Sequence, residues 1–111
     1  MSESASTLLP GTLEMLILKV VSAEAEHGWG IGNRLAHVSG GVFDVNQGSL
    51  YPALQRLLRK GWIKSEWRRT ENGRRARYYQ ITKSGRRQLV TERESWARQV
   101  EAVQLVLDWA L

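Results

Sequence analysis

The 111-residue sequence contains no cysteine and has only two histidines and two prolines. Without cysteine the chain can form neither a disulfide nor a thiolate metal site, which agrees with a reducing cytoplasm. No apolar run approaches the roughly 20 residues that a membrane-spanning helix needs. The first nine residues lack the basic start and apolar core of a secretory signal. We therefore expect a cytoplasmic protein that does not bind membranes.

The sequence also lacks the groups of residues from which active sites are built. His27 and His37 are the only histidines, and no paired carboxylates, glycine-rich phosphate loop or metal-ligand spacing is visible. His27 stands at a helix junction, where a turn or cap role is expected. The sequence therefore predicts no enzyme, no metal site and no cofactor.

Positive charge is the main feature of the composition. The formal net charge is +5, on a length that suits one domain. Residues 62–79 hold six basic and two acidic side chains, so most of the excess lies in this segment. A concentrated basic segment favours a polyanionic partner such as a nucleic acid.

The leucine-rich stretch before Gly61 has the pattern of a helix with one buried face and one polar, basic face. Pro52 fits only in a first turn, so the helix should begin near Gly48 or Ser49. Asn46 or Ser49 is the expected N-cap, and Gly61 the expected end. The residues of the apolar face are Leu50, Leu54, Leu57 and Leu58.

A hairpin is predicted directly after this helix. Residues 62–69 and 74–82 alternate in polarity and are rich in aromatic and basic side chains. Between them, Asn72-Gly73 tolerates the positive φ angles of a tight turn. A helix followed by a basic hairpin is the outline of a winged helix. In that fold the helix enters the major groove, and the hairpin lies against the DNA backbone or the minor groove.

Four motifs in this region resemble the PadR family of bacterial transcriptional regulators. The likeness extends from about Leu13 to Trp96, and it implies a winged helix-turn-helix domain that binds double-stranded DNA and dimerises through a C-terminal helix. The motifs are Gly48-Ser49-Leu50-Tyr51-Pro52-Ala53-Leu54, Gly61-Trp62-Ile63, Glu71-Asn72-Gly73-Arg74-Arg75-Ala76-Arg77-Tyr78-Tyr79 and Thr82-Lys83-Ser84-Gly85.

The predicted fold is mainly α with a small β-hairpin, and residues 10–82 form its DNA-binding domain. Pro10 begins a helix with an apolar stripe that ends near Ala25. A second helix is expected at about residues 28–38. An extended connector, residues 42–45, then leads to the helix before Gly61. Residues 1–9 are expected to be a flexible tail.

Residues 83–111 are predicted to form one long helix for dimerisation. Thr82 is its expected N-cap, and the helix can run to about Ala110. Its length of about 42 Å exceeds what this small body can cover. Apolar residues at heptad-like spacing form a seam, for which a second copy of the chain is the simplest partner. The seam consists of Leu89, Trp96, Val100, Val103 and Leu107.

The polar face of the helix before Gly61 supplies the first candidate DNA contacts. Glutamine pairs well with adenine and arginine with guanine, while serine and tyrosine hold phosphates. The alternative is a solvated helix face without a partner. For Tyr51, packing at the edge of the buried face is as good an interpretation as DNA contact. The candidates are Gln47, Ser49, Tyr51, Gln55 and Arg56.

The hairpin supplies the second group, Arg74, Arg75 and Arg77, as phosphate or minor-groove ligands. Strand alternation places Arg75 and Arg77 on one face and Arg74 on the other, so the three do not all reach one groove. An ordinary charged surface is the alternative. The aromatic residues of the hairpin are expected to pack in the sheet and core rather than to stack on bases. They are Trp62, Trp67, Tyr78 and Tyr79.

Trp96 is the candidate effector-binding residue. Because it lies on the seam, two copies would face each other across a two-fold axis, and two indoles can hold a planar molecule. The resemblance points the same way, since some family members bind flat aromatic compounds between the dimer helices. The alternative is a tryptophan that only anchors the dimer.

Together these observations predict a homodimeric repressor that binds a palindromic operator and is released by a small aromatic effector at the dimer interface. A winged helix that binds RNA or another protein through the same hairpin is the alternative. A dimer that binds DNA but senses no small molecule is a third interpretation.

Overall fold

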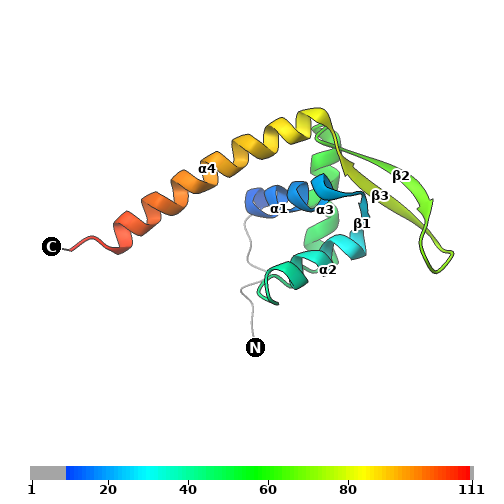
Figure 1. Cartoon of the computed structure of the whole chain (residues 1–111), viewed down its shortest axis with the longest axis horizontal. Coiled ribbons are helices and arrows are strands. Elements are labelled where there is room, and N and C mark those ends of the chain that lie inside the picture. Colours follow the sequence, from blue (N-terminus) through cyan, green and yellow to red (C-terminus); the bar gives the residue numbers. More distant parts are fainter. Residues whose placement is uncertain (1–9, 111) are drawn as a thin grey trace.

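The computed structural model describes residues 10–110, so the predicted tail, residues 1–9, lies outside the described residues. Within residues 10–110 the chain forms four helices and a three-stranded antiparallel sheet, which confirms the predicted winged-helix class (Figure 1). In chain order the elements are α1 (Pro10–Ala23), β1 (Glu26–His27), α2 (Gly28–Val38), α3 (Gln47–Arg59), β2 (Ile63–Arg69), β3 (Arg75–Ile81) and α4 (Lys83–Leu107).

The sheet has the strand order β1-β3-β2. Strands β2 and β3 form the hairpin, in register from Ile63 opposite Ile81 outward. On the other edge of β3, Glu26 of β1 pairs with Tyr79. The sequence predicted only a chain break at β1, because two residues carry no periodicity. Helix α1 also ends earlier than predicted, at Ala23.

The hairpin turn differs from the predicted tight Asn-Gly turn. Among the described residues that are not glycine, none has a positive φ, so Asn72 does not adopt the conformation that a two-residue turn would need. Within this turn only Gly73 is left-handed, at φ +80°. Its N–H donates to the carbonyl of Thr70 at 2.9 Å, and the N–H of Thr70 donates to the carbonyl of Arg74 at 2.6 Å. This longer turn still places the glycine where positive φ is required.

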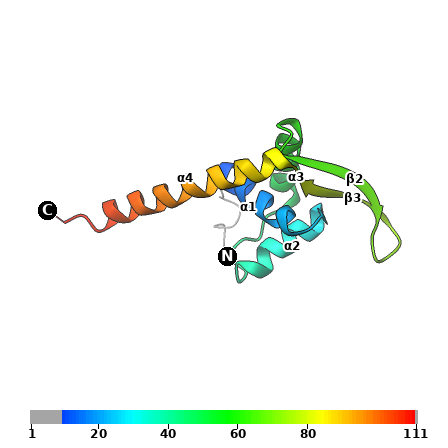
Figure 2. The same ribbon diagram turned by 45° about the horizontal axis from the view of Figure 1, so that its top comes forward.

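The core lies between α1, α2, α3 and one face of the sheet (Figure 2). Ile63, Tyr79 and Ile81 close it from the sheet side. The connector before α3 has no strand, but Val45 is buried and Phe43 packs against the core. The largest side chains that are more than 98% buried are Ile17, Leu18, Val21, Ile31, Leu50, Leu54 and Leu57.

Helix α4 is joined tightly to the ends of α3 and the hairpin. The predicted cap is confirmed, because Thr82 Oγ1 accepts from the Gly85 N–H at 3.0 Å. The same hydroxyl donates to the carbonyl of Gly61 at 2.7 Å. Gly85 leaves no room for a side chain, since an added Cβ would lie 2.0 Å from the carbonyl oxygen of Trp62.

Beyond this junction α4 runs antiparallel to α1 and then projects past the body (Figures 1 and 2). It ends at Leu107, three residues before the predicted Ala110. Every residue from 96 to 110 is exposed. No helix within residues 10–110 combines the length and the apolar character that spanning a bilayer requires.

Candidate nucleic-acid interface

The start of α3 is fixed by a side-chain cap. Asn46 Oδ1 accepts from the Ser49 N–H at 2.8 Å, so Asn46 rather than Ser49 is the N-cap. Gly61, at φ +74°, lies just past the end of the helix as predicted. Gln55 is exposed on the face opposite the buried leucines, Gln47 is exposed at the first position of the helix, and Ser49 is half-buried. The polar face of α3 is therefore open to solvent.

Tyr51 packs at the edge of the body, as one of its two interpretations predicted, and is also partly exposed to solvent. It is 46% exposed, yet its ring also lies against the start of α2. A Cβ added at Gly28 would come within 3.1 Å of the Tyr51 hydroxyl oxygen. Glycine at position 28 thus allows the ring to rest on α2 while its outer edge stays accessible.

Arg56 lies beside the core rather than on the open face. Its Nε donates to Glu14 Oε2 of α1 at 2.5 Å, and Lys60 Nζ donates to Glu14 Oε1 at 3.2 Å. Glu14 is only 8% exposed, so its charge requires these two cations. The Arg56 side chain is 31% exposed. The guanidinium therefore ties α3 to α1.

The outer part of the hairpin carries a cluster of arginines around one tryptophan, and we call this hairpin the wing. Trp67 is paired with Arg77 across the strands, so both lie on one face. The guanidinium carbons of Arg75 and Arg77 lie 5.2 and 5.7 Å from the centre of the Trp67 ring. Arg77 Nε also donates to Ser65 Oγ at 2.9 Å. These contacts fix two arginine side chains that would otherwise be mobile.

The aromatic residues of the wing divide into two groups. Tyr79 is buried, and Trp62 and Tyr78 are half-buried, as the sequence predicted. Trp67 is 56% exposed, so its expected role in the core was wrong. The pattern could not reveal this, because Trp67 continues the inward face of β2 beyond the point where the body ends. Burial raises the pKa of the Tyr79 hydroxyl, and the charge of Arg77 partly opposes this rise.

The wing is also connected to α2. His27 is the N-cap of α2, as expected, and its Nδ1 accepts from the Gly30 N–H at 3.0 Å. Its ring packs nearly perpendicular to that of Tyr78 of β3, with the ring centres 5.2 Å apart. Glu26 Oε2 lies 3.8 Å from His27 Nε2. Elements α2 and β3 therefore share one junction, next to the arginines of the wing.

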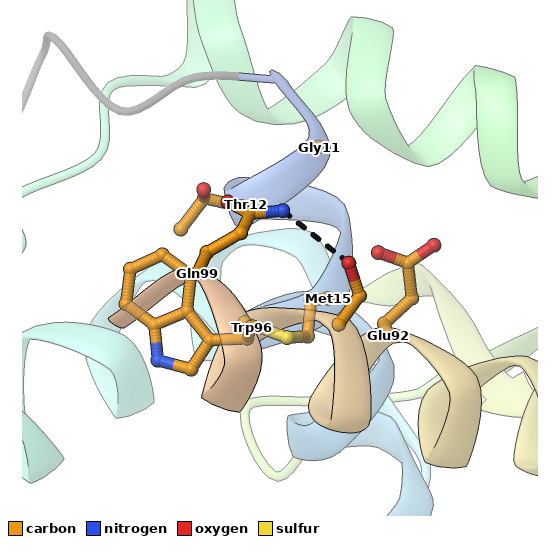
Figure 3. Close-up of a pocket in the computed structure, with 7 residues that line it drawn as sticks. Gly11, Thr12, Met15, Glu92, Trp96 and Gln99 are labelled. Atoms are coloured by element: carbon orange, nitrogen blue, oxygen red, sulfur yellow. Dashed lines mark hydrogen bonds between the residues drawn. The ribbon is translucent and has the colours of Figure 1, made fainter. Parts of the chain in front are cut away.

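A separate cavity of about 220 Å³ lies between α1 and α4, next to Trp96 (Figure 3). The indole of Trp96 is 45% exposed. On the α1 side the cavity is bounded by Thr12 and Met15, and on the α4 side by Glu92 and Gln99. The dashed line in Figure 3 marks the bond from Gln99 Nε2 to Ser95 Oγ, 3.3 Å long.

The seam on α4 is divided by the body of the protein. Leu89 is only 8% exposed and belongs to the core of its own protomer. Trp96, Val100 and Val103 are about half exposed, and Leu107 is 71% exposed. The part of the seam that a partner could cover therefore begins at Trp96, because α4 leaves the body there.

The comparisons with known proteins agree with this geometry. The family described as "Transcriptional regulator PadR-like family" matches residues 17–91, more than half of the chain. The protein belongs to the PadR family. A PadR-like transcriptional regulator of Bacillus cereus is 30% identical, with 95% of this chain and 100% of that one covered and a TM-score of 0.78.

Two further solved structures resemble this PadR protein. A PadR family transcriptional regulator of Eggerthella lenta is 28% identical, with 90% of this chain and 85% of that one covered and a TM-score of 0.78. A Streptococcus mutans protein has a TM-score of 0.80 over 93% of this chain and 92% of that one. At 24% identity the Streptococcus protein supports the fold alone.

Proposed function

We propose that this PadR family regulator is a homodimeric repressor that binds a palindromic DNA operator. The observations that carry the proposal are the open polar face of α3 and the arginine cluster on the wing. One copy reads a major groove with α3 and holds the adjacent backbone with the wing. Two-fold symmetry then requires two half-sites about one helical turn, some 34 Å, apart.

The proposed base and phosphate contacts from α3 are Gln47, Ser49, Tyr51 and Gln55. Gln55 is exposed and has the amide that pairs bidentately with adenine. The Ser49 and Tyr51 hydroxyls can each donate a hydrogen bond to a phosphate oxygen. For Arg56 we propose a positioning role in place of the base contact, because its guanidinium is held by Glu14.

The proposed wing contacts are Arg74, Arg75 and Arg77. Arg75 and Arg77 share the face of Trp67, whereas Arg74 lies in the turn. We assign the first two to neighbouring phosphates or the minor groove, and Arg74 to the backbone at the tip. Each ion pair with a phosphate releases counterions, so binding weakens steeply as salt rises.

We assign dimerisation to the exposed part of the seam, from Trp96 to Leu107. An effector with a flat aromatic body fits the cavity beside Trp96, whose indole offers a stacking surface. Such a compound would change the spacing of the two α3 helices, because α4 is joined to the end of α3 at Thr82 and Gly61. The operator-binding form would then be less populated.

The first test is a footprint on the DNA upstream of the protein's own gene, combined with light scattering. We expect a dimer that protects two symmetric half-sites. A monomer without protection would instead favour a winged helix that binds RNA or another protein. Arg75→Gln should weaken binding to all sequences and reduce the salt slope, whereas Gln55→Ala should alter the preference at one base pair.

The effector is tested by calorimetry with flat aromatic compounds on wild type and Trp96→Ala. Binding that disappears in the variant supports the site. Equal binding by both proteins would remove Trp96 from it. If no compound in a broad panel binds the wild type, the protein is a dimeric regulator that senses no small molecule, as the third interpretation holds.

A further inference from the structure

His27 joins three elements at the base of the wing. It is the second residue of β1, it pairs with Tyr78 of β3, and it caps α2 (Figure 1). Its side chain is only 23% exposed, so most of the ring is enclosed by these elements. None of the proposed DNA contacts involves this histidine. It lies instead where the body of the protein meets the wing.

The hydrogen bond at the start of α2 fixes the protonation state of the ring. Nδ1 of His27 accepts from the Gly30 N–H at 3.0 Å, and a ring nitrogen that accepts carries no proton. The capping form is therefore neutral, with its hydrogen on Nε2. In the charged form both ring nitrogens are donors, so Nδ1 would face another donor. Imidazole is the side chain that changes charge between about pH 5 and 8, so acid removes this cap.

Aromatic contacts extend from His27 in two directions. The ring of Trp29 lies nearly parallel to it, with the ring centres 6.4 Å apart. On the other side is Tyr78, and the guanidinium carbon of Arg68 lies 5.3 Å from the centre of the Tyr78 ring. A charge on His27 would place a second cation beside Tyr78, where it meets the like charge of Arg68. The neutral ring therefore suits these contacts better than the charged ring.

Tyr78 connects the histidine to the arginines of the wing. It directly follows Arg77 in β3 and stands three positions after Arg75. Strand alternation places Tyr78 on the face of β3 opposite the two arginines. Trp67 supports the arginine face, and His27 contacts the opposite face. The orientation of β3 relative to α2 therefore depends on the contact between His27 and Tyr78.

The charged groups around His27 are balanced in sign. Glu26 Oε2 lies 3.8 Å from Nε2, so a charged ring would move toward this carboxylate and away from Gly30. Cavities of about 590 and 500 Å³ adjoin the ring on the side of the wing and along α2, and His37 lines the second. Four carboxylates and four arginines line these cavities or flank Tyr78, so the exchange of Gly30 for Glu26 decides the outcome. They are Glu24, Glu26, Glu66 and Glu71, and Arg34, Arg68, Arg74 and Arg75.

We propose that neutral His27 is a positioning residue for the wing, and that its protonation releases β3 from the start of α2. The inference rests on the proposed function, in which Arg75 and Arg77 are wing contacts to DNA. The affinity for the operator should then fall as the pH drops from about 7.5 to about 5.5. A histidine in direct contact with a phosphate would give the opposite sign, because its charged form binds the phosphate more tightly.

The affinity is measured by fluorescence anisotropy with labelled operator DNA at constant ionic strength, for wild type, His27→Asn and His37→Asn. Asparagine is also a good N-cap, so His27→Asn keeps the start of α2 but neither titrates nor places a ring against Tyr78. His37 is exposed in the last turn of α2, so His37→Asn is the matched control. Wild type and control should each lose affinity about fivefold over this pH range, the effect of one N-cap contact. His27→Asn should bind as weakly as acidified wild type at every pH.

Amide hydrogen exchange gives a second measurement that needs no DNA. In wild type the protection factor of the Gly30 amide should fall about fivefold over the same pH range, and the amides of β3 should lose protection with it. Unchanged protection at Gly30 would refute the proposal whatever the protein binds.

The binding data separate failure of this inference from failure of the proposed function. If His27→Asn keeps the pH dependence of wild type, or if wild type binds more tightly in acid, the positioning role is wrong and the DNA-binding function stands. A wild-type protein that binds no DNA at about pH 7.5 would overturn the proposed function and this role with it. Urea unfolding of His27→Asn checks that a lower affinity is not the result of a less folded protein.

Discussion

The buried carboxylate of Glu14 in α1 is bonded to Arg56 of α3, 42 residues later in the chain, with 2.5 Å between Oε2 and Nε. The contact fixes the helix that carries the proposed base-reading residues onto the first helix of the body. It also removes Arg56 from the open face. The same carboxylate binds Lys60, so the last turn of α3 and its C-cap are both held by one residue.

Glu14→Gln should therefore destabilise the protein and loosen α3. The substitution keeps the shape of the side chain but leaves Arg56 without its counter-charge, at an expected loss of about 1–3 kcal/mol. Urea unfolding measures this loss. Glu66→Gln, which removes the exposed partner of Arg68, is the matched control and should change stability by less than about 0.5 kcal/mol. Equal losses would mean that the Glu14 pair is no stronger than a surface pair.

Trp67→Ala should weaken DNA binding more than it weakens folding. Removal of the indole frees Arg75 and Arg77, and each exposed cation–π contact contributes about 0.5–1 kcal/mol, so loss of both should lower the affinity roughly five- to thirtyfold. Fluorescence anisotropy with labelled operator DNA measures the change. Trp67→Phe keeps an aromatic face and should recover part of the affinity. If Ala and Phe behave alike, the ring does not position the arginines.

Gly85→Ala should unfold the junction at the start of α4. The added methyl group would overlap the Trp62 carbonyl, and we expect a loss of roughly 3 kcal/mol or more. Gly11→Ala is the matched control, because no atom lies within 4 Å of a Cβ there. That control should be neutral or stabilising by up to about 1 kcal/mol, as alanine is the better helix former. Thermal unfolding of both variants decides the comparison.

Tyr79 should make the folded state sensitive to high pH. Because burial raises the pKa of its hydroxyl, the folded state keeps the proton after the unfolded state has lost it. The contribution is thus complete below the usual pKa of about 10 and is lost as pH rises beyond it. Tyr79→Phe should lose less stability than wild type between about pH 9 and 11. Parallel stability curves for the two proteins would contradict the prediction.

Local signals in the sequence predicted the elements that local chemistry controls. Pro52 and Gly61 bounded α3, Asn46 was one of two candidate caps, and Thr82 marked the start of α4. Each of these residues acts through backbone atoms only a few positions away, so the sequence contains the whole interaction. The class of the fold followed from these elements and from the hairpin.

Features that depend on distant parts of the chain were not predictable in this way. The pairing of Arg56 with Glu14 requires α1 and α3 to be adjacent, which no spacing within α3 reveals. Leu89 and Trp96 repeat at the same heptad spacing, yet Leu89 is buried in its own protomer. The period identifies an apolar stripe but does not say which surface covers it. The same holds for Trp67 in β2. The alternation places it on the inward face of the strand but does not show that no element covers that face at the outer end of the hairpin.

The junction at Thr82, Gly61 and Gly85 joins the start of α4 rigidly to the end of α3, so the two helices move together. Helix α4 has 25 residues, so it is about 37 Å long. If α4 rotates by about 5° about this junction, its C-terminal end moves by roughly 3 Å, which is about half the rise of one helical turn. Conversely, a displacement of similar size at the C-terminal end of α4 would rotate α3 by the same small angle. The two α3 helices of the proposed dimer would then no longer match the spacing of successive major grooves.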